Sequence, residues 1–283
     1  MPGPIDLHTH SSVSDGTETP TQLIRAAVVA GLGTVALTDH DSTAGWQEAF
    51  GAAAGTGLTV IPGMELSTNY GPASVHLLAY LFNPLDGGII AETARIREGR
   101  LNRAERIVEK IGQDYDLTWD DVLAESSDGT TLGRPHIADA LVRKGIVANR
   151  TAAFESILHW RGAYYEKYYA PSPIEGVRMI VRAGGVPALA HPATHGKYRP
   201  MDDAYIATLA DEGLFGLEVG HRDNTDEGKV RLIALAKKLG LEVTGASDYH
   251  GEGKPNRLGE NTTAPEVLER LVARATGSSS FRG

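Results

Sequence analysis

Residues that can bind a metal ion recur along this chain at the ends of short, apolar, strand-like runs. In chain order they are His8, His10, Asp15, His40, Glu65, His76, His191, Asp248 and His250. Side chains alternate in direction along a strand, so His8 and His10 leave the same face of the first run, with Cα atoms about 7 Å apart. One His-x-His pair is weak evidence, but its recurrence at other strand ends indicates a site for several metal ions.

Strand-like and helical patterns alternate in the first third of the chain, which is typical of strands joined by crossover helices in a parallel sheet. Thr19 and Pro20 begin the first of these helices. The same alternation resumes after Pro173. The expected strands are 5–10, 34–38, 58–65, 74–80, 186–190, 215–219 and 241–245.

Between residues 87 and 169 the pattern becomes helical throughout. The length of 283 residues fits two domains as well as one barrel with an insertion. We therefore expect an α/β fold, a distorted (β/α)7-type barrel built from residues 1–86 and 170–283. Residues 87–169 would form a small all-helical insertion that caps the substrate site. The strand ends of such a barrel meet at one mouth, where the nine candidate ligands would gather.

Composition limits the kind of metal site and of partner. The chain has no Cys, so imidazole and carboxylate groups must bind the metal, which favours Mn, Fe or Zn. Its formal net charge of −9 argues against duplex nucleic acid as a partner. There is neither a basic, apolar leader nor an apolar run long enough to span a membrane, so we expect a cytoplasmic location and no membrane partner.

The ordered motifs resemble the PHP (polymerase and histidinol phosphatase) family of metal-dependent phosphoesterases. They are His8-Thr9-His10, Thr38-Asp39-His40-Asp41, Gly63-Met64-Glu65, His76, His191-Pro192 and Ser247-Asp248-Tyr249-His250. Within that family, Gly133-Arg134-Pro135-His136 is similar to a motif of the stand-alone enzymes with a helical insertion, which act on nucleoside phosphates or short RNA.

The resemblance implies three divalent metal ions. The first would be bound by His8, His10, Glu65 and Asp248, the second by Glu65, His76 and His191, and the third by Asp15, His40 and His250. Three divalent ions outweigh the three carboxylates, so the pocket would attract a phosphate although the whole protein is acidic. A hydroxide bridging two ions would be the nucleophile, because metal binding lowers the pKa of water to roughly 7.

The expected activity is hydrolysis of phosphate monoesters of nucleotides, either nucleoside 5′-monophosphates or 3′,5′-bisphosphates, or of short oligonucleotide ends. The substrate would thus be a small phosphorylated molecule. Candidate substrate-binding residues are Arg134, His136, Lys167 and His195. His221 is the candidate general acid, and Asp39 and Asp41 are candidates to orient ligand imidazoles.

Other functions compete with this one. Histidinol-phosphate phosphatase is an alternative within the same family. An amidohydrolase-type C–N hydrolase would also use a metal site on a β/α barrel, and a metal-stabilised binding module would need no catalysis. The chain has neither a Gly-x-Ser-x-Gly elbow nor a phosphate loop ending in Gly-Lys-Ser/Thr. Metal-assisted hydrolysis is therefore favoured.

Five arginines lie between Arg95 and Arg106, which is the pattern of a nucleic-acid-binding stripe. Glutamates are interleaved with them, namely Glu92, Glu98, Glu105 and Glu109. This spacing favours a helix face on which the two charges pair with each other. Tyr164, Tyr165, Tyr168 and Tyr169 would either stack on a base or pack the insertion onto the barrel.

Overall fold

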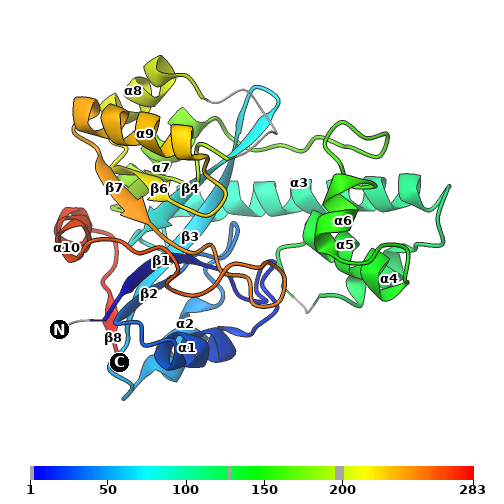
Figure 1. The fold of residues 1–283 in the computed structure, drawn as a ribbon, viewed down its shortest axis with the longest axis horizontal. Coiled ribbons are helices and arrows are strands. Elements are labelled where there is room, and N and C mark those ends of the chain that lie inside the picture. Colours follow the sequence, from blue (N-terminus) through cyan, green and yellow to red (C-terminus); the bar gives the residue numbers. More distant parts are fainter. Residues whose placement is uncertain (1–2, 127–128, 195–200) are drawn as a thin grey trace.

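The computed structural model describes residues 3–126, 129–194 and 201–283. Seven strands follow one another in the sheet in chain order: β1 (Ile5–Thr9), β2 (Thr34–Leu37), β3 (Thr59–Tyr70), β4 (Ala73–Tyr80), β5 (Val186–Leu189), β6 (Gly216–Gly220) and β7 (Glu242–Gly245). Thr9 bridges to Tyr249, just beyond β7, so the two ends of the sheet approach each other. The result is the expected nearly closed α/β barrel (Figure 1).

One strand runs against the others. β4 is antiparallel to both β3 and β5, whereas the remaining neighbours within β1–β7 are parallel. The alternating pattern predicted a parallel sheet, and β4 is the exception to that prediction. β3 continues to Tyr70 and turns at Gly71, whose φ is 61°, directly into β4. A parallel connection needs a dozen or more residues, and this turn has two.

Helices cover the outside of the barrel. They are α1 (Pro20–Val29), α2 (Trp46–Ala53), α7 (Pro173–Arg182), α8 (Asp203–Asp211), α9 (Asp226–Leu239) and α10 (Pro265–Arg274). As expected, Thr19 caps α1 by accepting a hydrogen bond from the Gln22 backbone N–H. The larger apolar core lies between the sheet and α1, α2, α7, α8 and α9, and a second core joins β1–β5 to α10.

The segment between β4 and α7 is helical. It contains α3 (Gly87–Ile111), α4 (Trp119–Leu123), α5 (Arg134–Arg143) and α6 (Arg150–Glu155). Figure 1 shows α3 running from the barrel out to the group formed by α4, α5 and α6. A third apolar core, which includes Ile107, Val122 and Leu141, holds this group together. Among the described residues, no helix has the length and apolar character needed to cross a membrane.

The packing of α7 on the β3–β4 hairpin depends on a small residue. A Cβ at Gly176 would lie 2.7 Å from Leu77 Cδ1 and 3.0 Å from Thr68 Cγ2. We predict that Gly176→Val lowers the free energy of unfolding by about 1–3 kcal/mol through overpacking. Gly51→Ala is the control, because nothing lies within 4 Å of that position in α2. Urea denaturation should show the control unchanged or slightly stabilised; equal stability of both variants would contradict this packing.

Candidate metal centre

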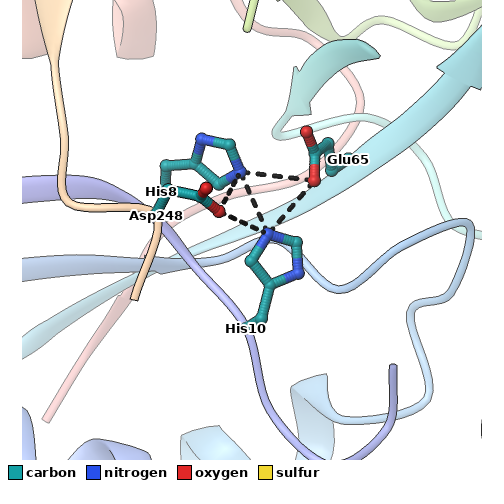
Figure 2. A group of neighbouring side chains, drawn as sticks. All are labelled: His8, His10, Glu65 and Asp248. Atoms are coloured by element: carbon teal, nitrogen blue, oxygen red, sulfur yellow. Dashed lines mark hydrogen bonds and ion pairs between the residues drawn. The ribbon is translucent and has the colours of Figure 1, made fainter. Parts of the chain in front are cut away.

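Four donor atoms converge at the barrel mouth (Figure 2). His8 and His10 come from the end of β1, Glu65 comes from β3, and Asp248 follows β7. Nε2 of His8 lies 3.0 Å from Nε2 of His10, and Oε2 of Glu65 lies 3.4 and 3.1 Å from these two nitrogens. Oδ1 of Asp248 lies 3.4 and 3.3 Å from the same pair. A tetrahedral ion with bonds of about 2.0–2.2 Å holds its donors roughly 3.3–3.6 Å apart, so this group has the spacing of one metal site.

A second group lies beside the first. Nε2 of His250 is 3.2 Å from Oδ1 of Asp15, and Nδ1 of His10 is 3.6 Å from the same oxygen. His10 thus faces the first group with Nε2 and the second with Nδ1. Nε2 of His40 is 3.7 Å from Oδ2 of Asp15. Closely spaced donor atoms thus group Asp15 and His250 with His10, whereas the expected third set had His40 in that place.

The third group surrounds the other oxygen of Glu65. Oε1 lies 2.8 Å from Nδ1 of His76 and 3.2 Å from Nε2 of His191. Nδ1 of His40 is 3.2 Å from Oε2. All nine residues singled out in the sequence thus form one connected cluster. His76 and His191 have side chains that are 19% and 22% exposed, so the cluster opens to solvent on their side.

The donor set suits divalent cations. Nδ1 of His40 and Nε2 of His250 are buried without a hydrogen-bond partner among the described residues, which is costly unless an ion accepts their lone pairs. Burial alone would raise the pKa of Glu65, yet the surrounding imidazoles, His40 first, hold it well below its usual range. The carboxylate is therefore ionised. The residues present fit a metal centre of imidazole and carboxylate ligands.

Glu218, which the sequence reasoning missed, orients two of these histidines. Nδ1 of His8 donates to Oε1 of Glu218 at 2.9 Å, and the backbone N–H of His191 donates to Oε2 at 2.8 Å. With its proton on Nδ1, His8 presents the Nε2 lone pair to the first group. Glu218 is fully buried in β6, flanked by the apolar Leu217 and Val219. Its charge within a buried strand was the only sequence signal.

Lys254 was also missed. Its Nζ donates to Oδ2 of Asp248 at 2.7 Å, which leaves Oδ1 facing His8 and His10. Burial would raise the pKa of Asp248, but the nearby cations, Lys254 first, hold it well below its usual range. The lysine side chain is 38% exposed. Asp248 itself has φ of 55°, a conformation that a non-glycine residue seldom adopts.

Asp39 and Asp41 each bind a serine of a neighbouring segment, and neither contacts an imidazole of the described residues. Asp39 accepts from the backbone and hydroxyl of Ser11, at 2.8 and 2.7 Å. Asp41 accepts from the backbone and hydroxyl of Ser67, both at 2.7 Å, and pairs with Nε of Arg100 at 2.9 Å. Asp39 therefore holds the residues that follow His10, and Asp41 holds the loop of His40 against β3.

Two of the four candidate substrate residues, Arg134 and His136, lie together on the first turn of α5. His136 is buried, and its Nδ1 accepts from the Gly133 backbone N–H at 3.2 Å, which ties it to the start of α5. Arg134 lies on the same turn, with its guanidinium 5.3 Å from the Phe154 ring. Lys167 is exposed. His195 lies outside the described residues.

His221 is close to the metal ligands. Nδ1 accepts a hydrogen bond from the Asp223 backbone N–H at 3.0 Å, so the proton of the neutral ring resides on Nε2. Nε2 lies 3.4 Å from Oδ2 of Asp248 and has no hydrogen-bond partner among the described residues. Burial lowers the pKa of His221, but the contact with Asp248 raises it above its ordinary value overall.

The expected pairing of charges along α3 was wrong. In the part of the chain that the structure describes, none of its arginines pairs with a glutamate of the same helix. Arg100 pairs with Asp41, and Arg106 pairs with Glu166, which lies between α6 and α7. Tyr165, Tyr168 and Tyr169 lie against arginines of α3, and the Arg95 guanidinium is 3.5 Å from the Tyr169 ring centroid.

Comparisons with known proteins agree with the fold and the site. A model of the PHP domain matches residues 6–116. A 3′,5′-nucleoside bisphosphate phosphatase from Chromobacterium violaceum is 31% identical over 94% of each chain. A 5′-3′ exoribonuclease from Haemophilus influenzae is 30% identical over 90% of this chain and 93% of that protein. A crystal structure from Bifidobacterium adolescentis, described as a metal-dependent phosphoesterase, has a TM-score of 0.94 at 41% identity and covers 97% of each chain.

The fold and the buried histidine and carboxylate cluster define a metal-dependent phosphoesterase, a hydrolase that acts on phosphate esters. The chain belongs to the PHP family. A C–N hydrolase or a binding module without catalysis is therefore disfavoured as the function.

Glu218 provides a test of how the centre is oriented. We predict that Glu218→Gln lowers metal affinity or kcat by about 10- to 100-fold, because the amide no longer offers His8 and His191 two acceptor oxygens. Glu242→Gln is the control, since it removes a surface ion pair with Arg270. Metal content and phosphatase activity would be measured side by side. Wild-type values for Glu218→Gln would refute the assigned role.

Proposed function

We propose that this enzyme hydrolyses phosphate monoesters of nucleotides, or the phosphorylated ends of short oligonucleotides. The observation that carries the reaction type is the cluster of nine imidazole and carboxylate groups, in which five imidazoles surround Glu65. The substrate class rests on the two relatives, which are named for a nucleoside bisphosphate and for RNA. We further propose that the nine residues bind three divalent ions, with Mn, Fe or Zn as the metals that suit them.

The protein's own groups prepare the site. Divalent ions bound there supply Lewis acidity at the phosphoryl oxygens and lower the pKa of water. Glu218 fixes the His8 ring so that its Nε2 is available as a ligand. Lys254 occupies one oxygen of Asp248 and leaves the other directed at His8 and His10. These contacts hold the ligands in place before substrate binds, which lowers the cost of reorganisation during the reaction.

The helical segment 87–169 serves, in this proposal, as a cap over the barrel mouth. It reaches the ligand loops directly, because the Thr131 backbone N–H donates to Val13 O and Arg150 Nη1 donates to Asp15 O. Arg134 and His136, on the first turn of α5, are the cap residues that we assign to substrate binding. The planar guanidinium of Arg134 suits a phosphate, which it can contact through two parallel hydrogen bonds.

His221 is the group that we assign to protonate the leaving oxygen. Its Nδ1 is held by the Asp223 N–H, so Nε2 is the atom that carries and releases the proton. That atom is buried next to Asp248 and has no other partner among the described side chains. A nucleoside alkoxide is a poor leaving group and needs such a proton, whereas p-nitrophenolate does not.

We predict that His221→Asn lowers kcat by about 100-fold or more for a nucleoside 5′-monophosphate, and by less than about 5-fold for p-nitrophenyl phosphate. Metal content measured on the same samples serves as the control, because loss of ions would reduce both rates together. Equal losses on the two substrates at full metal content would assign His221 a role other than proton donation.

The proposed substrate class is tested by chain length. We predict that the Mn-loaded enzyme has a higher kcat/KM for a mononucleotide or a pentanucleotide than for a 30-mer. The net charge of −9 repels a long polyanion, which needs many basic contacts to bind. Histidinol phosphate belongs in the same panel. A preference for the 30-mer that weakens steeply with salt, or for histidinol phosphate, would overturn the proposal.

A further inference from the structure

The loop after β7 brings a lysine to the metal centre. Nζ of Lys254 lies 2.7 Å from Oδ2 of Asp248, while Oδ1 of the same carboxylate faces the ligands His8 and His10. One carboxylate group therefore separates the ammonium from the first group of metal ligands. Among the described residues, no other lysine forms an ion pair with any of the nine candidate ligands.

The loop that carries Lys254 is anchored on both sides of this residue. The Gly253 backbone N–H donates to His250 O at 3.2 Å, and Nδ2 of the buried Asn256 donates to Ser247 O at 2.7 Å. The backbone of Lys254 is thus held in place before a substrate arrives. A charge that is already in position stabilises a transition state with little cost in reorganisation.

Most of the hydrogen-bonding capacity of Lys254 is unused. An ammonium group has three N–H donors, and the carboxylate of Asp248 is the single acceptor among the described residues. The lysine side chain is 38% exposed, so the pair is not sealed inside the fold. Two donors are therefore left for a ligand or for water.

Charge balance indicates what kind of ligand Lys254 suits. A carboxylate that binds a divalent ion already has its counter-charge, so Asp248 does not need an ammonium for that purpose. An ammonium this close to the metal ligands also repels the ions. The arrangement is unfavourable for metal binding alone. It becomes favourable when one anion contacts both the ions and the lysine.

The proposed proton donor meets the same oxygen of Asp248. Nε2 of His221 lies 3.4 Å from Oδ2, the oxygen that accepts from Lys254. In a phosphate monoester, the leaving oxygen and the non-bridging oxygens are attached to one phosphorus atom. An ester that places its leaving oxygen at His221 therefore brings its non-bridging oxygens into the neighbourhood of Lys254.

We propose that Lys254 is a catalytic residue that donates hydrogen bonds to a non-bridging oxygen of the scissile phosphate. An ammonium is a compact charge with strong, charge-assisted donors, and it would add to the positive charge of the metal ions. The proposal rests on the phosphatase function proposed above and deepens it. It does not depend on which nucleotide is the substrate, because every monoester has this phosphoryl group.

The test uses Lys254→Met, which keeps a long unbranched side chain without the charge, and Lys254→Arg, which keeps the charge. Lys144→Met is the matched control, because Nζ of Lys144 also contacts an aspartate, Oδ2 of Asp121 at 3.0 Å. We expect Lys254→Met to retain the metal content of the wild type, because the repulsion that is removed offsets the hydrogen bond lost to Asp248.

Binding of inorganic phosphate would then be measured by calorimetric titration at saturating Mn, so that weaker metal binding is not mistaken for weaker phosphate binding. The Kd for phosphate should rise about 10- to 100-fold in Lys254→Met, by less in Lys254→Arg, and by less than about 2-fold in Lys144→Met. An unchanged Kd in Lys254→Met would overturn the proposal and leave Lys254 as a residue that only positions Asp248.

Steady-state kinetics would compare a nucleoside 5′-monophosphate with p-nitrophenyl phosphate. For Lys254→Met, kcat/KM should fall by a similar factor for both, about 10- to 100-fold, because their non-bridging oxygens are the same. A loss confined to the nucleotide would contradict a contact with the phosphoryl group. If the protein hydrolyses no nucleotide, the proposed function fails, and the phosphate titration still decides the role of Lys254.

Discussion

The carboxylate of Glu65 is the group on which the rest of the site depends. It is 1% exposed and has five imidazoles around it, those of His8, His10, His40, His76 and His191. A buried carboxylate costs several kcal/mol unless positive charge offsets it, and an imidazole that binds a metal ion is neutral and supplies none itself. Imidazoles carry nitrogen lone pairs instead. Glu65 and these rings are therefore stabilised together when cations lie between them, which explains why the cluster is both buried and highly polar.

The backbone around Glu65 sets where the ligands meet. Its N–H donates to Thr38 O, and its carbonyl accepts from the Asp41 N–H, so the end of β2 and the middle of β3 are held side by side. His40 lies between Thr38 and Asp41 and therefore faces Glu65. On the other side of β3, the hairpin register pairs Glu65 with Leu78 and Ser67 with His76. Because β4 is antiparallel, His76 reaches the barrel mouth from the first half of its strand.

Much of the candidate site could be predicted from the sequence because the donors stand at strand ends and a barrel brings such ends together. The pairing of donors could not be predicted. His10 joins Asp15 and His250 in one group of donors, whereas His40 joins Glu65 and His76, and this follows from loop conformation, which leaves no periodic signal. The antiparallel direction of the fourth strand could have been predicted, because the few residues between 65 and 74 leave no room for a crossover helix.

The two residues that the sequence did not reveal, Glu218 and Lys254, differ in the signal that they leave in it. Glu218 carries a signal, because strand alternation turns it away from the face of Leu217 and Val219. A charge in that position implies a polar partner inside the barrel. Lys254 carries none, because it lies in an irregular loop and contacts Asp248 only through the folded chain. Sequence periodicity indicates on which face of a strand a residue lies, but it does not indicate which distant loop contacts that residue in the fold.

Side chains of the helical segment 87–169 hold two of the loops that carry metal ligands. Asp41 has a left-handed backbone, with φ of 51°, and its carboxylate is fully buried. Arg97 and Arg100 from α3 hold its carbonyl and its carboxylate, so the strained residue next to His40 is maintained by a helix of that segment. Arg150 does the same for the loop of Asp15, since its guanidinium joins Asp139 to the Asp15 carbonyl. Without these contacts, two ligand-bearing loops would lose the partners that offset their strain and buried charge. The segment therefore contributes to the position of the ligands as well as to the surface that meets the substrate.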